Sequence, residues 1–130
     1  MQRNRIIASF CPRRYALLLM LCLLLGCPVV AWSHAHPKQM TPAPDATLQQ
    51  APKQVRILFT EDLEAAFSSL KVTDAQGDSV TAGDSQVADD QPKEMSVPLE
   101  SLPPGTYTVH WHVVARDGHT TEGTYDFQLQ

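Results

Sequence analysis

One stretch near the C-terminus alternates apolar and polar residues so regularly that it restricts the fold of the whole chain. The apolar positions share one face of an extended strand and are Tyr107, Val109, Trp111 and Val113. The opposite face carries Thr108, His110, His112 and Val114. Asp117, Gly118 and His119 follow, and glycine accepts the positive φ angle of a tight turn. We therefore predict a long strand that packs on a core and runs into a turn bearing a carboxylate and an imidazole.

Shorter alternating segments recur along the chain, and none shows the 3.6-residue period of a helix. Turn-forming residues separate the predicted strands, which cover residues 55–59, 67–73, 95–99 and 124–130. Before them, the prolines at positions 37, 42, 44 and 52 favour an extended edge segment. Residues 74–78 indicate a hairpin turn, and the polar, acidic residues 83–93 indicate a surface loop.

The spacing of Leu102, Gly105 and Tyr107 resembles the tyrosine corner of Greek-key sandwiches, in which the hydroxyl bonds back to nearby backbone. Together with the short strands, it predicts an all-β fold. We expect a Greek-key β-sandwich of about seven strands, of the immunoglobulin or cupredoxin type.

The N-terminal quarter of the chain is typical of a secretory signal peptide, with four arginines and then an apolar run from Tyr15 to Leu25. We predict a signal peptide over residues 1–33, cleaved after Ser33, and one mature domain over residues 34–130. Cleavage after Ala35 and lipoprotein processing at Cys27 are the alternatives. Either signal implies export, and the predicted location is the periplasm.

Removal of the signal peptide changes both charge and chemistry. It leaves 6 basic residues against 14 acidic ones, a formal charge of −8, which disfavours nucleic acid as a partner. All three cysteines lie in the signal peptide, so the mature domain has no disulfide and no thiolate ligand.

Histidines lie at both ends of the mature chain. Cleavage after Ser33 makes His34 the first residue, and its free amine and imidazole can close a chelate ring on a metal as neutral nitrogens. His119 offers a third nitrogen and Asp117 an anionic oxygen. Nitrogen-rich ligands with one carboxylate suit Cu(II) first, and Ni(II) or Zn(II) after it.

A second chelate competes for the same terminus. With His34 as residue one, His36 is residue three, so the amine, two backbone amides and the His36 imidazole can also bind Cu(II). One ion can use only one of the two modes. His110 and His112 read as surface residues of a strand, and His112 is at most a donor behind the ligands.

Several motifs in order resemble the CopC family of periplasmic copper-resistance and copper-homeostasis proteins across the mature domain. The first two motifs are His34 followed eight positions later by Pro42, and the Phe-Thr-Glu stretch at 59–61 with Phe-Ser at 67–68. The other two are Leu-x-x-Gly-Thr-Tyr-x-Val-x-Trp at 102–111 and Val-Val-x-x-Asp-Gly-His at 113–119. The resemblance implies a Greek-key β-sandwich whose Cu(II) ligands are His34, Asp117 and His119. Some members hold Cu(I) in a methionine-rich loop, but here residues 74–95 contain only Met95.

The resemblance implies a periplasmic Cu(II) carrier or buffer rather than an enzyme, passing copper to a CopD-like inner-membrane copper transport protein. We expect a monomer. Two other functions stay open from the residues alone. One is a histidine-brace copper oxidase or monooxygenase, and the other is a metal-free immunoglobulin-like interaction module.

Overall fold

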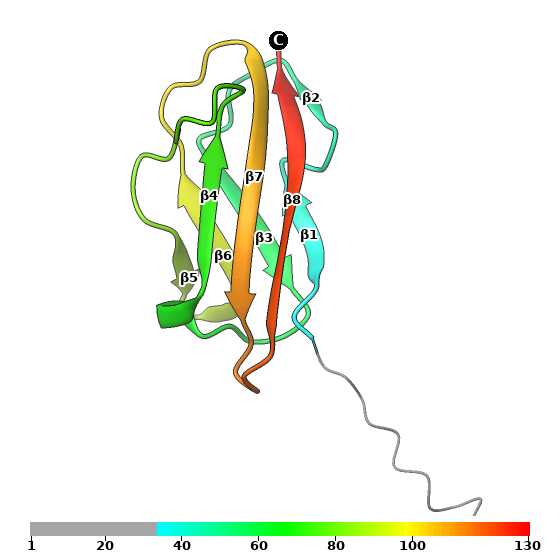
Figure 1. The fold of residues 1–130 in the computed structure, drawn as a ribbon, viewed down its shortest axis with the longest axis vertical. Helices are drawn as coiled ribbons and strands as arrows, with labels where there is room; N and C mark the ends of the chain where they lie inside the picture. The colour runs from blue at the N-terminus through cyan, green and yellow to red at the C-terminus, as the bar shows by residue number, and fades with distance from the viewer. Residues whose placement is uncertain (1–33) are drawn as a thin grey trace, which may run out of the picture. The chain divides into compact units, whose positions relative to one another are not determined.

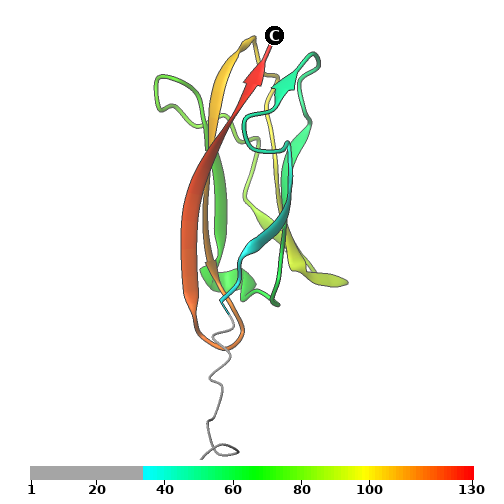
Figure 2. The ribbon, with the colours of Figure 1, turned by 90° about the vertical axis from the view of Figure 1, so that its right-hand side faces the viewer.

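Two four-stranded sheets packed face to face make up residues 34–130, the part of the chain that the computed structural model describes (Figures 1 and 2). The predicted signal peptide, residues 1–33, lies outside the described residues. Among residues 34–130, no helix is both long and apolar enough to cross a membrane.

The first sheet is antiparallel throughout, in the order β1 (Pro37–Thr41), β3 (Gln54–Phe59), β6 (Gln91–Pro98) and β5 (Gln86–Ala88). The second has the order β2 (Thr47–Leu48), β8 (Thr120–Leu129), β7 (Gly105–Val114) and β4 (Ser69–Thr73), with β2 parallel to β8. One 3-10 turn, η1 (Ala65–Phe67), precedes β4. The predicted all-β Greek-key sandwich is confirmed.

The structure departs from the predicted strands at three places. It has eight strands rather than about seven, because two residues of β2 pair with β8. The segment predicted as a surface loop, 83–93, contains β5 and the start of β6. The pairing of β5 shifts register after Val87, which breaks the alternation that reveals a strand. The strand predicted from Phe67 begins at Ser69, and Phe67 is 69% exposed.

The core lies between the sheets and is made by the alternating residues that the sequence marked as inward. In β3 these are Val55, Ile57 and Phe59; in β7, Tyr107, Val109 and Val113; in β8, Tyr125, Phe127 and Leu129. Trp111 is only partly buried, and its ring packs edge-on against Phe59 with centroids 5.6 Å apart.

Two buried tyrosines differ in how their hydroxyl groups are satisfied. The Tyr107 hydroxyl donates to the carbonyl oxygen of Pro103 at 2.6 Å, which confirms the predicted tyrosine corner. The buried Tyr125 hydroxyl has no hydrogen-bond partner among residues 34–130. Burial raises the pKa of Tyr125 to about 12.

Removing the two hydroxyls should therefore have opposite effects on stability. Tyr107→Phe should lower the free energy of unfolding by about 1 kcal/mol, because it deletes a satisfied hydrogen bond. Tyr125→Phe should leave stability unchanged or raise it, because it removes an unpaired buried polar group. Urea denaturation of both variants measures the difference, and an equal loss in the two would contradict the assignment.

The stabilities of Tyr125→Phe and the wild type should also respond differently to alkaline pH. The Tyr125 pKa is about 12 in the folded protein, and an unfolded tyrosine ionises near pH ~10. The contribution of Tyr125 to stability is thus complete below pH ~10 and is lost as pH rises toward 12. Between pH 9 and 11, urea denaturation should show the wild type losing more stability than Tyr125→Phe. If the stability of the two proteins fell in parallel with pH, burial would not raise the pKa of Tyr125.

Candidate metal centre

The turn between β7 and β8 holds two of the predicted ligands at one end of the sandwich. The Ala115 N–H donates to the His119 carbonyl, and the Gly118 N–H donates to the Ala115 carbonyl, both at 2.8 Å. Gly118 has φ 88°, a left-handed conformation that a side chain would strain. Asp117 and His119 flank this glycine and are brought to the same side of the turn.

Asp117 and His119 make two contacts within hydrogen-bond distance of each other. Asp117 Oδ1 accepts from the His119 backbone N–H at 3.0 Å, and Oδ2 lies 3.0 Å from His119 Nδ1. The backbone and then the side-chain hydrogen bond from His119 lower the pKa of Asp117, and the charge of His34 adds to this. Because a carboxylate only accepts, this contact favours the proton on Nδ1, which leaves the Nε2 lone pair of His119 for a metal.

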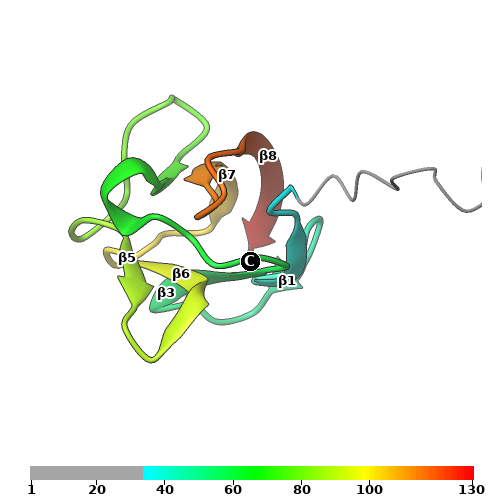
Figure 3. The same cartoon turned by 90° about the horizontal axis from the view of Figure 1, so that it is seen from below.

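The third predicted ligand, His34, reaches this turn from the other end of the described chain. Its ring centroid is 5.1 Å from that of His119 and 5.9 Å from that of His36. In Figures 1 and 2, the start of the described chain and the turn between β7 and β8 lie at the same end of the sandwich, and Figure 3 views the molecule from that end. The structure thus brings His34, Asp117 and His119 together.

Side-chain hydroxyls from the two sheets position the N-terminal segment, residues 34–36. Thr60, which follows β3, has its Oγ1 3.0 Å from the His36 amide nitrogen and 3.1 Å from the His34 carbonyl oxygen. Thr121, in β8, donates its hydroxyl to the Ala35 carbonyl at 2.6 Å. The Ala35 side chain is fully buried in the core.

The three clustered side chains do not yet form a finished metal site. Within residues 34–130, no three histidine, cysteine, aspartate or glutamate side chains already stand where they could hold one ion. Asp117 and His119 are engaged with each other, and in the uncleaved chain the His34 nitrogen is part of a peptide bond. Both turn side chains are about half exposed, at 41% and 54%, so they have room to rotate.

The two accessory histidines occupy different positions. His36 is exposed next to His34, with its backbone held by Thr60. His112 lies on the outer face of the second sheet, where it pairs with Glu122 and Ser69 across the neighbouring strands.

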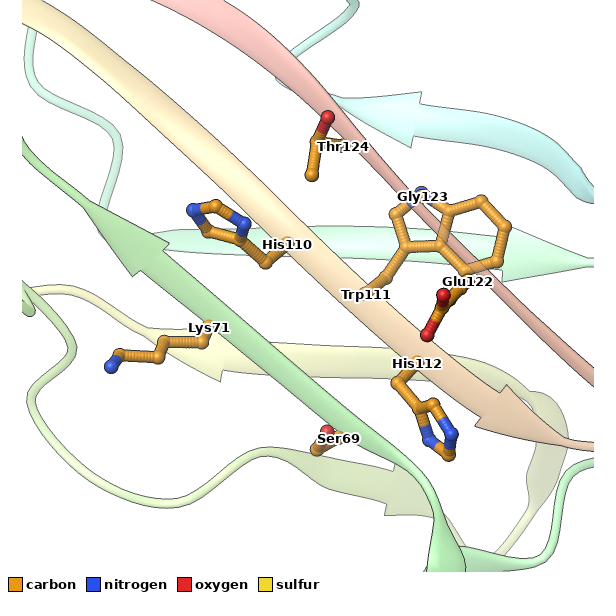
Figure 4. A pocket seen from close by; sticks show the side chains of 8 residues that line it. All are labelled: Ser69, Lys71, His110, Trp111, His112, Glu122, Gly123 and Thr124. Carbon is orange, nitrogen blue, oxygen red and sulfur yellow. The ribbon is translucent and has the colours of Figure 1, made fainter. Parts of the chain in front are cut away.

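A shallow hollow on that outer face also contains His110 (Figure 4). The His110 Nε2 atom is 3.1 Å from the Thr73 hydroxyl. No described hydrogen bond or ring contact within residues 34–130 joins His112 to the turn at 115–119. Its role behind the ligands stays a prediction.

Sequence reasoning missed the residues that position the terminus. Thr60 lies within the Phe-Thr-Glu stretch that carries the family resemblance, but a single threonine has no signature of its own. Thr121 is one of two adjacent threonines in β8. The only sequence feature that marks Ala35 is its small size between two histidines. Its burial could not be predicted, because it depends on where the two sheets meet.

Comparisons with known proteins agree with this architecture. Residues 37–130 match the model of the CopC domain. "Protein YobA" of Escherichia coli (strain K12) is 38% identical over 118 residues, covering 90% of this chain and 94% of that protein.

Two solved structures are also similar. CopC from Methylosinus trichosporium OB3b has a TM-score of 0.70 and 29% identity, covering 75% of this chain and 94% of that one. PcoC, described as a methionine-rich copper resistance protein from Escherichia coli, has a TM-score of 0.66 and 32% identity, covering 75% of this chain and all of that one. With a family model that matches residues 37–130, the chain belongs to the CopC domain family.

Proposed function

We propose that residues 34–130 form a periplasmic copper carrier or buffer that binds one Cu(II) ion through His34, Asp117 and His119. The observation that carries the proposal is the approach of the His34 ring to within 5.1 Å of the His119 ring, beside Asp117. The relative PcoC is described as a copper resistance protein, which supports copper as the cargo.

The donor set supports Cu(II) over other copper chemistry. The amine and imidazole of His34, the His119 imidazole and the Asp117 carboxylate are nitrogen and oxygen donors, which suit Cu(II), whereas Cu(I) favours thioethers. Met95 is the only methionine between residues 74 and 95, and it is 1% exposed. Its sulfur therefore belongs to the core rather than to a surface Cu(I) site.

The same geometry supports a carrier rather than a copper oxidase. In a histidine-brace oxidase the metal needs an open coordination position for its substrate. Here Asp117 would add an anionic donor beside His119, and the half-exposed turn leaves both side chains within reach of a partner protein. The acceptor that the family implies is a CopD-like inner-membrane copper transport protein, and we propose that a monomer delivers the ion.

The proposal requires signal cleavage after Ser33, and the burial of Ala35 supports that position. Cleavage after Ala35 would remove both the proposed ligand His34 and the buried residue Ala35. Cleavage after Ser33 leaves the whole N-terminal segment in place and frees the His34 amine.

Chains that begin at different residues should therefore differ in stability. A chain beginning at His36 loses the buried Ala35 methyl group and the hydrogen bond from Thr121. Its free energy of unfolding should fall by about 1–2 kcal/mol relative to a chain beginning at His34. A chain beginning at Ser33 is the control and should match the His34 chain in urea denaturation. Equal stability of all three would show that Ala35 contributes nothing to the core.

Copper titration tests the ligand set directly. The chain beginning at His34 should bind one equivalent of Cu(II) tightly in competition with a chelator of known affinity. Retaining Ser33, which blocks the amine, or His119→Ala should each weaken binding by about 100-fold, or roughly 2.7 kcal/mol. His110→Ala is the matched control, because it removes an exposed histidine on the outer face of the second sheet that has no assigned role in the site. An affinity unchanged by Ser33 would exclude the terminal amine as a ligand.

A further inference from the structure

The mature N-terminus offers two metal chelates that exclude each other. One joins the His34 amine and imidazole to the turn at 115–119. The other uses the His34 amine, the amide nitrogens of Ala35 and His36, and the His36 imidazole, in a square plane that suits Ni(II) as well as Cu(II). Forming the second chelate requires both amide N–H groups to release their protons to water as the two metal–nitrogen bonds form.

The backbone of the N-terminal segment is held in a way that opposes the second chelate. The His36 N–H donates to Thr60 Oγ1 at 3.0 Å, and the same hydroxyl donates to the His34 carbonyl at 3.1 Å. The Thr60 N–H donates to the His36 carbonyl at 2.9 Å. A metal at the His36 nitrogen would have to break the first of these bonds.

The residue between the two histidines is held more firmly still. The Ala35 carbonyl accepts the Thr121 hydroxyl at 2.6 Å, and the Ala35 side chain is fully buried between the sheets. Wrapping the backbone around a square-planar ion would rotate this peptide and withdraw the methyl group from the core. Thr60 follows a strand of the first sheet and Thr121 lies in the second, so the segment is fixed to both.

From these contacts we propose that Thr60 and Thr121 form a clamp that selects the metal by denying it the square-planar chelate at His36. The clamp keeps residues 34–36 extended and aims His34 at the turn. Its consequence is discrimination against Ni(II): both ions lose the all-nitrogen square plane, but the mixed nitrogen and carboxylate site that remains suits Cu(II) first and Ni(II) only after it. This inference shares with the proposed function the cleavage after Ser33 that frees the His34 amine, and it rests on the proposed copper site only for its biological purpose.

Nickel titration of the chain beginning at His34 tests the clamp, with Ni(II) chloride as the probe. Square-planar Ni(II) bound by four nitrogens gives a visible absorption band and is diamagnetic. In the wild type this band should be weak. In Thr60→Val and Thr121→Val the apparent Ni(II) affinity of the band should rise by about tenfold for each hydrogen-bonding hydroxyl removed. Adding His36→Ala to either variant should abolish the band.

Matched controls separate the clamp from a general loosening of the fold. Thr60→Ser keeps the hydroxyl and should behave as the wild type. A peptide with the sequence of residues 34–38 has no clamp and sets the upper limit of Ni(II) affinity. Circular dichroism and urea denaturation establish that each variant is folded during the titration.

Two results would overturn the inference. One is a wild-type protein that shows the His36-dependent band with the affinity of the free peptide. The other is a folded Thr60→Val/Thr121→Val variant without any gain in Ni(II) affinity. The nickel readout does not involve His119, whereas the Cu(II) site is tested by His119→Ala. Failure of the clamp and failure of the proposed copper site are therefore distinguishable.

Discussion

The anchoring of Ala35 between the two sheets is the constraint on which the candidate site depends. Chain termini are usually the least ordered part of a domain, because few contacts hold them. Here the first residues of the predicted mature chain are fixed by a buried methyl group and by hydroxyls from both sheets. A terminal amine can serve as a precise ligand only when the fold holds it in this way. The position of His34 is thus a property of the core.

The same part of the core links the strands that carry the two hydroxyls. Trp111 packs against Phe59, the residue before Thr60, and covers Gly123, two residues after Thr121. A Cβ atom at Gly123 would lie 2.6 Å from the Trp111 ring, so only glycine permits this close approach. The indole therefore packs between Phe59 of β3 and Gly123 of β8, close in sequence to the two threonines that hold the N-terminal segment.

The fold could be predicted from the sequence wherever a strand buries one face. Alternation located β3, β7 and β8, and the spacing around Tyr107 indicated the corner that the structure confirms. Alternation failed for β5, whose register shift disrupts the period, and for β2, which is only two residues long. Both strands are held by backbone pairing and bury few side chains, so the pattern of apolar and polar residues does not reveal them.

The candidate site was predictable to the extent that it depends on residue type. Histidines at both ends and an aspartate in a glycine turn could be picked out as candidate ligands from residue type, and the structure places the side chains of His34, Asp117 and His119 near one another. Their role as metal ligands stays a proposal. The clamp could not be found in this way, because Thr60 and Thr121 act on backbone atoms 24 and 86 residues away. Contacts of this kind exist only once the sheets have packed, and threonine is too common in strands to signal them.

The two halves of the proposed site differ in how firmly the fold holds them, and this difference suits the carrier function proposed above. The half at His34 is fixed to the core, whereas Asp117 and His119 are half exposed and already satisfy each other. For the copper site proposed here, binding an ion would exchange the contact between carboxylate and imidazole for two bonds to the metal. Release would restore that contact, so neither side chain would be left unpaired after transfer. Such an exchange lowers the net free energy gained on binding the ion, and it also lowers the barrier to releasing it. A tightly preformed site would have neither effect.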